Sequence, residues 1–452
     1  MSGTAPEQKE NRMGTMPINK LLLTISVPIM LSMLVQALYN IVDSAFVAQI
    51  NENALSAVSL AFPMQNFMIA IAAGTGVGVN ALLSKSLGAK KQELADKTAN
   101  VSIFLALMNW VVFVIIGIFF AEAFLKGQSD IPEILAYGKT YLRICMFCSL
   151  FAYMQMAMER LLQGTGLTFY SMLSQASGAI INIIMDPILI FGLGPFPKMG
   201  VAGAATATIV GQFAAMCLSI AFNLKKNKEI HFDLKNILPT AYVVKHIYAV
   251  AVPSILMISM SSVMIFGLNR ILAGFTATAI AVFGVYFKLQ SFVFMPIFGL
   301  NNGMVPIIAY NYGARKRERI IKTMKSSMFC AVSIMLAGLL IFQLLTVPLL
   351  HLFNASENMM EIGIPALRII SLCFLMAGFN IVGSAVFQAL GNGVYSLLLS
   401  VARQLFVLLP AAFLLAQLGV LRNVWFAFPI AEFVCLLLCI VLLKKILKKL
   451  DF

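Results

Sequence analysis

Twelve apolar stretches, each long enough to cross a bilayer as a helix, fill most of this 452-residue chain. A helix needs about 20 apolar residues to span the hydrocarbon core. Hydrophobic residues make up 60% of the chain and charged residues only 11%, which excludes an ordinary soluble domain. The sequence therefore predicts an all-α polytopic membrane protein embedded in the lipid bilayer. The expected helices lie near residues 21–49, 54–83, 98–121, 134–158, 168–193, 201–223, 242–269, 276–304, 323–346, 359–388, 393–418 and 424–443.

Lysine and arginine gather in alternate segments between these stretches. The net charge of +14 would suggest nucleic-acid binding in a soluble protein, but in a membrane protein this distribution sets the topology, because basic loops stay in the cytoplasm. We therefore expect a multi-pass protein of the plasma (cytoplasmic) membrane with both termini cytoplasmic and no nucleic-acid partner. The basic residues of the expected cytoplasmic segments are Lys85, Lys90, Lys91, Lys97, Lys225, Lys226, Lys228, Lys235, Arg315, Lys316, Arg317, Arg319, Lys322 and Lys325, followed by the tail KKILKK.

Polar segments divide the chain into parts. Residues 1–16 are polar and contain no apolar core, so we expect a disordered cytoplasmic tail rather than a signal peptide. The longest polar connection separates six apolar stretches from six, which gives an N-lobe at 17–226, a cytoplasmic linker at 227–241 and a C-lobe at 242–452. The seven cysteines have no histidine at metal-ligand spacing, so we expect no transition-metal site.

The two halves repeat each other at an offset of 225 residues. SLGAKKQELADKT at 86–98 matches NYGARKRERIIKT at 311–323, and QGTGLTFYSML at 163–173 matches QALGNGVYSLL at 388–398. A Val-Pro pair also recurs, ending at Pro28 and Pro253. Each half contains an even number of stretches, so the halves run the same way through the membrane. This predicts two six-helix lobes related by a pseudo-two-fold axis along the membrane normal.

Two carboxylates lie inside apolar stretches, Asp43 in the first and Asp186 in the fifth. An ionisable group near the bilayer centre costs roughly 2.5 to 3.5 kcal/mol on insertion scales, so such groups face the protein interior and mark ion or substrate pathways. The alternative is a structural hydrogen-bonding role. We expect these two residues to carry function.

Polar side chains form lines with helical spacing in three stretches of the first half. Carboxylate, amide and hydroxyl oxygens suit a proton or Na⁺, because hard cations prefer oxygen ligands. The spacing does not separate the two ions. The three lines are Gln36, Asn40 and Asp43 in the first stretch, Gln175, Asn182 and Asp186 in the fifth, and Thr208 and Gln212 in the sixth.

The second half lacks the corresponding acids, because the offset places Leu268 opposite Asp43 and Ala411 opposite Asp186. The cation site is therefore expected on one side only. Glu432 is a further acid near a helix end, and Arg403 is its candidate structural partner.

Polar and methionine side chains offer a wall for a central cavity, since methionine adapts to varied ligands. The same residues can instead pin helices together. The candidates are Gln36, Asn40, Met68, Gln175, Gln212, Met257, Gln290, Asn380 and Gln388.

Two kinds of residue predict local irregularity. Pro28 and Pro253 each remove a helix hydrogen bond, so we expect both to act as hinges that kink the first and seventh helices. The runs AAGTGVG at 72–78 and GLNNG at 299–303 permit close helix approach or local unwinding.

Catalytic motifs are missing from the sequence. There is no Gly-rich phosphate loop, HExxH or GxSxG, and there is no nucleotide-binding domain to drive an ATP-dependent pump. We therefore expect a transporter that is driven by an ion gradient, not an enzyme, and no organic cofactor.

Several longer segments together resemble the multidrug and toxic compound extrusion (MATE) family. They are VPIMLSMLVQALYNIVDSAFVAQI at 27–50, SLGAKK at 86–91, NIIMDPILIFGLG at 182–194, GVAGAATAT at 200–208 and VPIIAYNYGA at 305–314. The resemblance implies two lobes that open alternately to either side and efflux of drug-like molecules driven by inward H⁺ or Na⁺. It also implies a coupling site made by Asp43, Asn182, Asp186 and Thr208, and small organic substrates that are mostly cationic. We expect the protein to act as a monomer.

Departures from the family and rival functions define the remaining alternatives. The chain lacks the acids on the seventh and tenth helices that another branch uses for Na⁺, and it has Gln163 where relatives often carry an arginine. A flippase of lipid-linked oligosaccharides would share the fold, but it would need several cationic side chains in its cavity, and only Lys288 and Arg403 are candidates. A receptor or a membrane enzyme is a weaker alternative, and a major-facilitator transporter would carry a loop signature between its second and third helices that this chain lacks.

Overall fold

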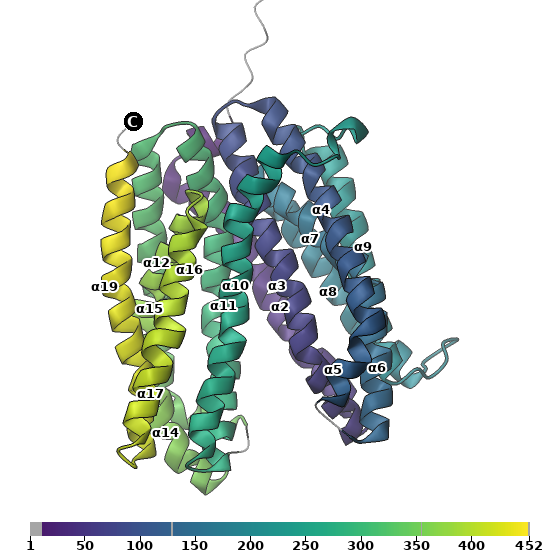
Figure 1. Cartoon of the computed structure of the whole chain (residues 1–452), viewed down its shortest axis with the longest axis vertical. Coiled ribbons are helices and arrows are strands. Elements are labelled where there is room, and N and C mark those ends of the chain that lie inside the picture. Colours follow the sequence, from purple (N-terminus) through teal and green to yellow (C-terminus); the bar gives the residue numbers. More distant parts are fainter. Residues whose placement is uncertain (1–10, 128–129, 354, 451–452) are drawn as a thin grey trace, which may run out of the picture.

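The computed structural model describes residues 11–127, 130–353 and 355–450, which are almost entirely helical and contain no β-strand (Figure 1). The first half contains α1 (Arg12–Thr15), α2 (Ile18–Ala48), α3 (Glu52–Gly88), α4 (Gln92–Phe119), α5 (Ala121–Lys126), α6 (Pro132–Phe147), α7 (Ser149–Gly164), α8 (Thr168–Phe191) and α9 (Val201–Lys226). The linker contains the short helix η1 (Leu234–Asn236). The second half contains α10 (Ala241–Ala273), α11 (Ala277–Gly313), α12 (Arg317–Leu344), α13 (Thr346–His351), α14 (Glu357–Ser371), α15 (Phe374–Ala389), α16 (Gly393–Val401), η2 (Ala402–Leu408), α17 (Leu409–Ala416), α18 (Leu421–Val424), α19 (Ala427–Leu447) and η3 (Lys448–Leu450).

The helices confirm the predicted polytopic membrane fold. Ten spans in the described part of the chain are long and apolar enough to cross a membrane, and two bent helix pairs bring the number to twelve if each pair is one span. Every expected stretch coincides with one of these spans. Helices α3 and α11 continue several residues beyond the predicted ends, because their last turns pack against the opposite half of the molecule.

Sharp bends occur in the fourth and tenth spans. Helices α6 and α7 meet at 45° around Cys148, and α14 and α15 meet at 50° around Cys373. The predicted hinge residues Pro28 and Pro253 lie inside single helices, α2 and α10, and their role as hinges stays a prediction. A proline inside a helix removes one backbone hydrogen bond, and the hydrogen bonds on either side keep the helix continuous.

Backbone geometry repeats at the offset found in the sequence. Lys90 and Arg315 both have φ of 56°, in the left-handed region that residues other than glycine rarely adopt. Gly166 and Gly391 also match, with φ of 85° and 78°. Each pair is separated by 225 positions, so the internal repeat extends to the turns that end corresponding helices.

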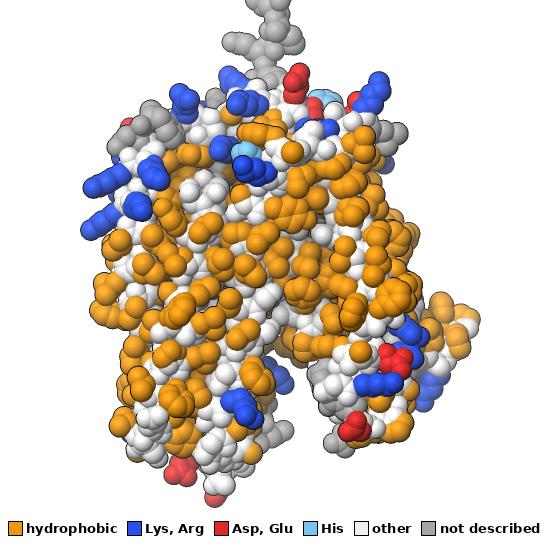
Figure 2. All heavy atoms as spheres, viewed as in Figure 1, with side chains coloured by type: hydrophobic (Ala, Val, Ile, Leu, Met, Phe, Trp, Pro, Cys, Tyr) orange, Lys and Arg blue, Asp and Glu red, His pale blue; other side chains and the backbone are white. Residues whose placement is uncertain are grey.

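The two halves form two lobes that touch at one end and diverge toward the other (Figure 1). Helix α2 packs on α11, and α3 packs on both α10 and α11. The ends in contact carry α1, the end of α19 and most of the lysine and arginine side chains, whereas the surface is hollowed between the lobes at the opposite end (Figure 2). We call these the closed end and the open end.

Glycines allow the lobes to approach closely at the closed end, as the two glycine-containing runs predicted. A Cβ added to Gly78 would overlap the carbonyl of Ile247, and one added to Gly303 would overlap Ser26. Gly88 on α3 lies against the Tyr310 carbonyl, and Gly313 on α11 lies against the Lys85 carbonyl. These last two contacts are symmetric, since both glycines and both carbonyl residues are related by the same offset of 225.

The amino-terminal tail differs from its predicted disorder over residues 11–16. Asn11 accepts a hydrogen bond from the backbone N–H of Met13 at 2.9 Å and caps the short helix α1. The Met13 side chain is fully buried. This apolar anchor inside a polar segment was too short to register as a structural signal. Residues 1–10 lie outside the described residues.

Candidate functional site

Asp43 and Asp186 come together between α2 and α8, inside the N-lobe. Their carboxyl groups lie within hydrogen-bonding reach of each other. Asp186 is fully buried, and Asp43 is half-buried. Two carboxyl groups form a hydrogen bond only when one of them carries a proton. The pair is therefore a place where a proton can be held between two acids.

Asn182 and Thr208 extend this pair onto α9. In the orientation that satisfies its neighbours, the Asn182 amide Nδ2 donates to Asp186 Oδ2 at 3.1 Å. Its Oδ1 accepts from the Thr208 backbone N–H at 2.9 Å and lies 3.2 Å from the Thr208 hydroxyl. Both side chains are buried. The structure thus brings all four predicted coupling residues into one cluster, which we call the acid pair site.

Glycines on α8 and α9 create this arrangement. A Cβ on Gly178 would lie 2.8 Å from the Gly211 carbonyl oxygen, and a Cβ on Gly211 would lie 3.1 Å from the Asn182 Cβ atom. The two helices can therefore approach at backbone distance one to two turns from the acids. This close crossing places Thr208 against Asn182.

Tyr39 belongs to the acid pair site, although the sequence reasoning missed it. It lies one helical turn before Asp43 on α2, and its hydroxyl is within hydrogen-bonding reach of Thr208. The signal was its spacing of four residues from Asp43, which puts both side chains on one helix face. A tyrosine among apolar residues is equally consistent with core packing.

A second polar group lies beside the site on α3 and α6. Gln65 Nε2 lies 3.2 Å from the Tyr141 hydroxyl and donates a longer contact of 3.5 Å to the Cys145 sulfur. Tyr141 and Cys145 are buried. These groups continue the polar environment of the acid pair toward the core of the N-lobe.

Unpaired oxygens point to what the site can bind. Within the described residues, Oδ1 of Asp43 and Oδ1 of Asp186 are buried and have no hydrogen-bond partner. An unpaired buried carboxylate oxygen is costly. The atoms available as ligands are oxygens of carboxylate, amide and hydroxyl groups, so the residues fit a proton or a hard cation such as Na⁺. In the orientation described, the Asn182 N–H group occupies Asp186 Oδ2, so that oxygen is not available to a metal ion.

The other predicted polar residues of the N-lobe are partly brought together. Gln175 Nε2 donates to Gln36 Oε1 at 3.1 Å, which links α8 to α2. Gln212 is half-buried, with its Oε1 unpaired among the described residues. Asn40, by contrast, is exposed. The line of three polar residues on α2 therefore divides between the acid pair site and the helix surface.

The C-lobe holds a different polar cluster. Glu432 is buried, and it accepts hydrogen bonds from Arg403 Nη1 at 3.0 Å and from Asn380 Nδ2 at 2.7 Å. Arg403 lies in η2, a π-helical turn of the kind that is frequent at functional sites. The structural pairing of Glu432 with Arg403 is thus present. It also neutralises Arg403, one of the two cationic residues that a flippase cavity would use, and the other, Lys288, is exposed.

The remaining predicted cavity residues are dispersed. Met257 Sδ accepts a contact of 3.7 Å from the Ser384 hydroxyl, and Gln290 is half-buried. Gln388 and Met68 are buried. Asn380 contacts Glu432 within the C-lobe, and the role of these residues as a cavity wall stays a prediction.

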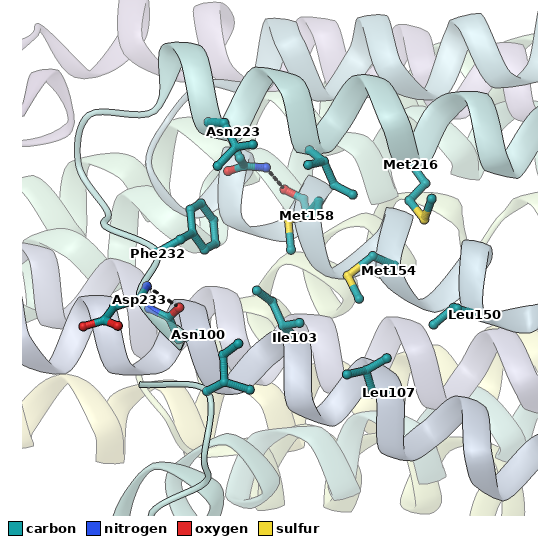
Figure 3. Close-up of a pocket in the computed structure, with 13 residues that line it drawn as sticks. Asn100, Ile103, Leu107, Leu150, Met154, Met158, Met216, Asn223, Phe232 and Asp233 are labelled. Carbon is teal, nitrogen blue, oxygen red and sulfur yellow. Dashed lines mark hydrogen bonds between the residues drawn. The ribbon is translucent and has the colours of Figure 1, made fainter. Parts of the chain in front are cut away.

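A cavity of about 430 Å³ lies in the N-lobe, where the linker meets the helices (Figure 3). Its walls come from α4, α7 and α9, with Met154, Met158 and Met216 directed into it and Phe232 of the linker at one end. It contains none of the nine predicted cavity residues and none of the acid pair site. Its lining is mostly apolar, with Asn100, Asn223 and Asp233 as its polar members.

Glu159 and Arg160 near the end of α7 are both buried. Arg160 Nη1 donates to Gln163 Oε1 at 3.0 Å and to Asn302 Oδ1 on α11 at 2.9 Å. Gln163 Nε2 in turn donates to the Ser171 hydroxyl at 3.0 Å. The arginine therefore ties the N-lobe to the C-lobe, and Gln163 holds it in place.

Comparisons with known proteins agree with this architecture. The MatE family model matches residues 28–188 and 253–414, once in each lobe. The chain is 28% identical over 434 residues to the multidrug export protein MepA of Staphylococcus haemolyticus (strain JCSC1435), which covers 96% of this chain and 95% of that protein. It is 25% identical over 429 residues to MepA of Staphylococcus aureus (strain MSSA476), with coverage of 93% and 92%.

Solved structures give the same result. One described as the outward-facing conformation of a multidrug resistance MATE family transporter of the MOP superfamily has a TM-score of 0.92 at 26% identity, over 98% of this chain and 99% of that chain. A MATE structure in complex with MaL6 has the same score, identity and coverage. Because the family model matches more than half of the chain, with one match in each repeat, this protein belongs to the MATE family of transporters.

Proposed function

We propose that the protein is a secondary active exporter of small amphipathic organic compounds, mostly cations, driven by entry of H⁺ or Na⁺. The observation that carries this proposal is the contact between Asp43 and Asp186. Both acids lie inside apolar helices, where bulk water does not stabilise their charge. Family membership and the MepA relatives, which are multidrug export proteins, support efflux as the transport activity. The acid pair site is the proposed coupling site.

A proton is the coupling ion that the geometry supports best. The facing carboxyl groups need one proton to share, and the Asn182 nitrogen already occupies one Asp186 oxygen. Na⁺ is the alternative, with the unpaired oxygens of both acids and the Thr208 hydroxyl as its ligands. Loss of the ion would leave two negative charges in contact, which would repel each other and favour binding of a cationic substrate in their field.

The proposed transport cycle moves the two lobes. The basic residues gather at the closed end, and the positive-inside rule assigns that end, with both termini, to the cytoplasm. With this assignment the hollow between the lobes opens to the outside, and the similar multidrug resistance transporter is likewise described as outward-facing. Movement of α2 about Pro28 and of α10 about Pro253 is the proposed hinge motion between the two states.

The membrane potential drives export when the cycle moves net charge inward, as when one ion enters for a neutral substrate or two ions enter for a monovalent cationic substrate. A potential of about 100 mV supplies about 2.3 kcal/mol for each charge that crosses. By the rule of tenfold per 1.4 kcal/mol, this corresponds to a substrate gradient of roughly forty- to fiftyfold. Substrate would enter the hollow between the lobes, near the Gln36 and Gln175 pair.

Reconstitution tests the proposal. The purified protein is reconstituted into liposomes, and the liposomes are loaded with a fluorescent organic cation. Efflux of this cation is followed after a pH gradient or a Na⁺ gradient is imposed across the membrane. We expect gradient-dependent movement in the wild type and its loss in Asp43→Asn. The matched control is Asp233→Asn, which makes the same chemical change at an exposed linker residue. Asp43→Asn moving substrate as fast as the wild type under every gradient would rule the proposal out.

A further inference from the structure

Residues 11–16 cross the junction of the two lobes at the closed end. This segment, which we call the strap, includes α1 and the buried side chain of Met13. The Met13 side chain packs near Gly166 of the N-lobe, since a Cβ on that glycine would lie 3.5 Å from Met13 Cγ. The strap is therefore an integral part of the closed end rather than a free tail.

On the N-lobe side, the strap binds the turn between α7 and α8. Asn11 Nδ2 donates to the Thr165 carbonyl at 3.3 Å, and Arg12 Nη2 donates to the Gly166 carbonyl. Asn11 also lies within hydrogen-bonding reach of Glu229 in the linker, where burial raises the pKa of that carboxyl group. The strap thus holds main-chain groups of a turn that belongs only to the first half.

On the C-lobe side, the strap binds α11 and the start of α12. Asn311 Nδ2 donates to the Met13 carbonyl at 3.0 Å, and Lys316 Nζ donates to the Gly14 carbonyl at 3.0 Å. Arg319 Nη2 donates to the carbonyls of Met13 at 3.0 Å and Met16 at 2.8 Å. Two cationic side chains and a buried amide therefore donate hydrogen bonds to the backbone of the strap. Hydrogen bonds from charged donors are stronger than those from neutral donors.

The repeat shows that this set of donors is specific to one half. The offset places Leu94 opposite Arg319 and Ser86 opposite Asn311, whereas Lys91 corresponds to Lys316, so the first half lacks two of the three donors. The strap also lies next to the symmetric contacts of Gly88 and Gly313 that close the lobes together. Separation of the lobes at this end would pull the Thr165 turn away from α12, and the strap cannot keep both sets of bonds.

We propose that the strap is a latch that stabilises the conformation closed at this end and must leave one lobe before the opposite conformation forms. The inference rests on the proposed alternating access of the lobes. A ligand or condition that releases residues 11–16 would shift the conformational equilibrium without touching the acid pair site.

Distances between spin labels test the latch without any transport measurement. One pair of cysteines replaces Lys226 and Lys444 at the closed end, and a second pair replaces Lys126 and Arg422 at the open end; all four positions are exposed. The less buried native cysteines, Cys148, Cys217 and Cys330, are first replaced by alanine. The label pairs are then combined with removal of residues 2–16, with Met13→Asp or with the milder Arg319→Gln.

In the distance distribution of the Lys226 and Lys444 label pair, we expect each latch variant to lower the ratio of molecules with the lobes in contact at the closed end to molecules with the lobes apart there. The ratio should fall by about tenfold or more, equivalent to about 1.4 kcal/mol. The distance across the opposite end should shorten in the same molecules. Lys322→Gln, at an exposed position one turn further along α12, should leave both distributions unchanged. Unchanged distributions in all three latch variants would overturn the proposal, as would an equal shift in Lys322→Gln. A wild type that moves no substrate would remove the proposed function but would leave this result standing.

Discussion

Asp186 on α8 is completely buried, and its carboxyl group faces that of Asp43 on α2, within hydrogen-bonding reach. Neither acid has a lysine or arginine partner among the hydrogen bonds of the described residues. Asp43 reaches Asp186 because α2 packs against α8, and the close crossing of α8 and α9 places Thr208 beside Asn182. Two acids held in this way act as one unit, since the charge on each depends on the other.

The acid pair predicts non-additive effects of substitution. Asp43→Asn and Asp186→Asn should each reduce the rate of gradient-driven efflux at least about tenfold, equivalent to about 1.4 kcal/mol. The double variant should be no worse than either single variant, because one substitution already removes the shared proton. Initial rates in liposomes measure all three. Rates that multiply in the double variant would show that the two acids work separately.

The hydroxyl of Tyr39 should contribute to transport through Thr208. Tyr39→Phe removes a neutral hydrogen bond of about 1 kcal/mol, so we expect a roughly fivefold lower efflux rate and a loss of folding stability of at most about 1 kcal/mol. The control is Tyr170→Phe on α8, whose ring stays packed at 4.9 Å from Phe222. Equal rates in Tyr39→Phe and the wild type would exclude Tyr39 from the coupling site.

Much of this molecule was predictable from the sequence, because the bilayer restricts the chain to long apolar helices. The four residues Asp43, Asn182, Asp186 and Thr208 were identified because polar groups in apolar helices are costly and their spacing reveals a common face. Tyr39 escaped this reasoning, since a tyrosine is equally at home in a core. The sequence could predict which faces meet, but not the contact between the two acids.

Two features needed tertiary structure. The bends at Cys148 and Cys373 have no adjacent glycine or proline to predict them. The strap was missed because its anchor is one methionine in a polar segment. Its stability comes from Arg319 and other donors about 300 residues away in the chain, and local composition carries no trace of such partners.

The symmetric glycine contacts at the closed end predict a cost for added methyl groups. Gly88→Ala and Gly313→Ala would each push a Cβ into a carbonyl of the opposite lobe. We expect a loss of about 1–3 kcal/mol for the closed conformation, the range for overpacking, seen as a shift toward separated lobes in the spin-label distances. Gly284→Ala is the control on α11, because nothing lies within 4 Å of its added Cβ. A similar shift in that control would argue against a specific glycine contact.

Glu122 on α5 predicts a pH response outside the membrane spans. Hydrogen bonds from Lys139 at 2.5 Å and from Lys126 lower its pKa from 4.5 to about 2. A lowered pKa means that the ion pairs stabilise α5 above pH 4.5 and lose this effect as the pH falls toward 2. Protection of the Ala121–Lys126 amides from hydrogen exchange should therefore be equal at pH 7 and pH 5, and lower in Glu122→Gln at both. Protection that already falls between pH 7 and pH 5 in the wild type would contradict this assignment.

The cluster of Glu432, Arg403 and Asn380 should act on stability rather than on coupling. Glu432→Gln leaves Arg403 without its carboxylate. Breaking a buried pair costs about 3–5 kcal/mol, and the 27% exposure of the Arg403 side chain reduces our expectation to about 1–3 kcal/mol. Replacing both residues by glutamine should recover part of this loss, because no unpaired charge remains.

Thermal unfolding and efflux measured on the same preparations separate the two roles of Glu432. If Glu432→Gln is less stable but still responds to the ion gradient, the cluster is a structural joint of the C-lobe, and the acid pair site is the one place where the ion acts. We expect Asp43→Asn to keep normal stability and to lose its response to the gradient. If Glu432→Gln behaves in the same way, Glu432 is a second coupling acid, in the C-lobe. The one-sided arrangement would then be wrong, because each lobe would hold its own titrating group despite the absence of acids at the positions related to Asp43 and Asp186.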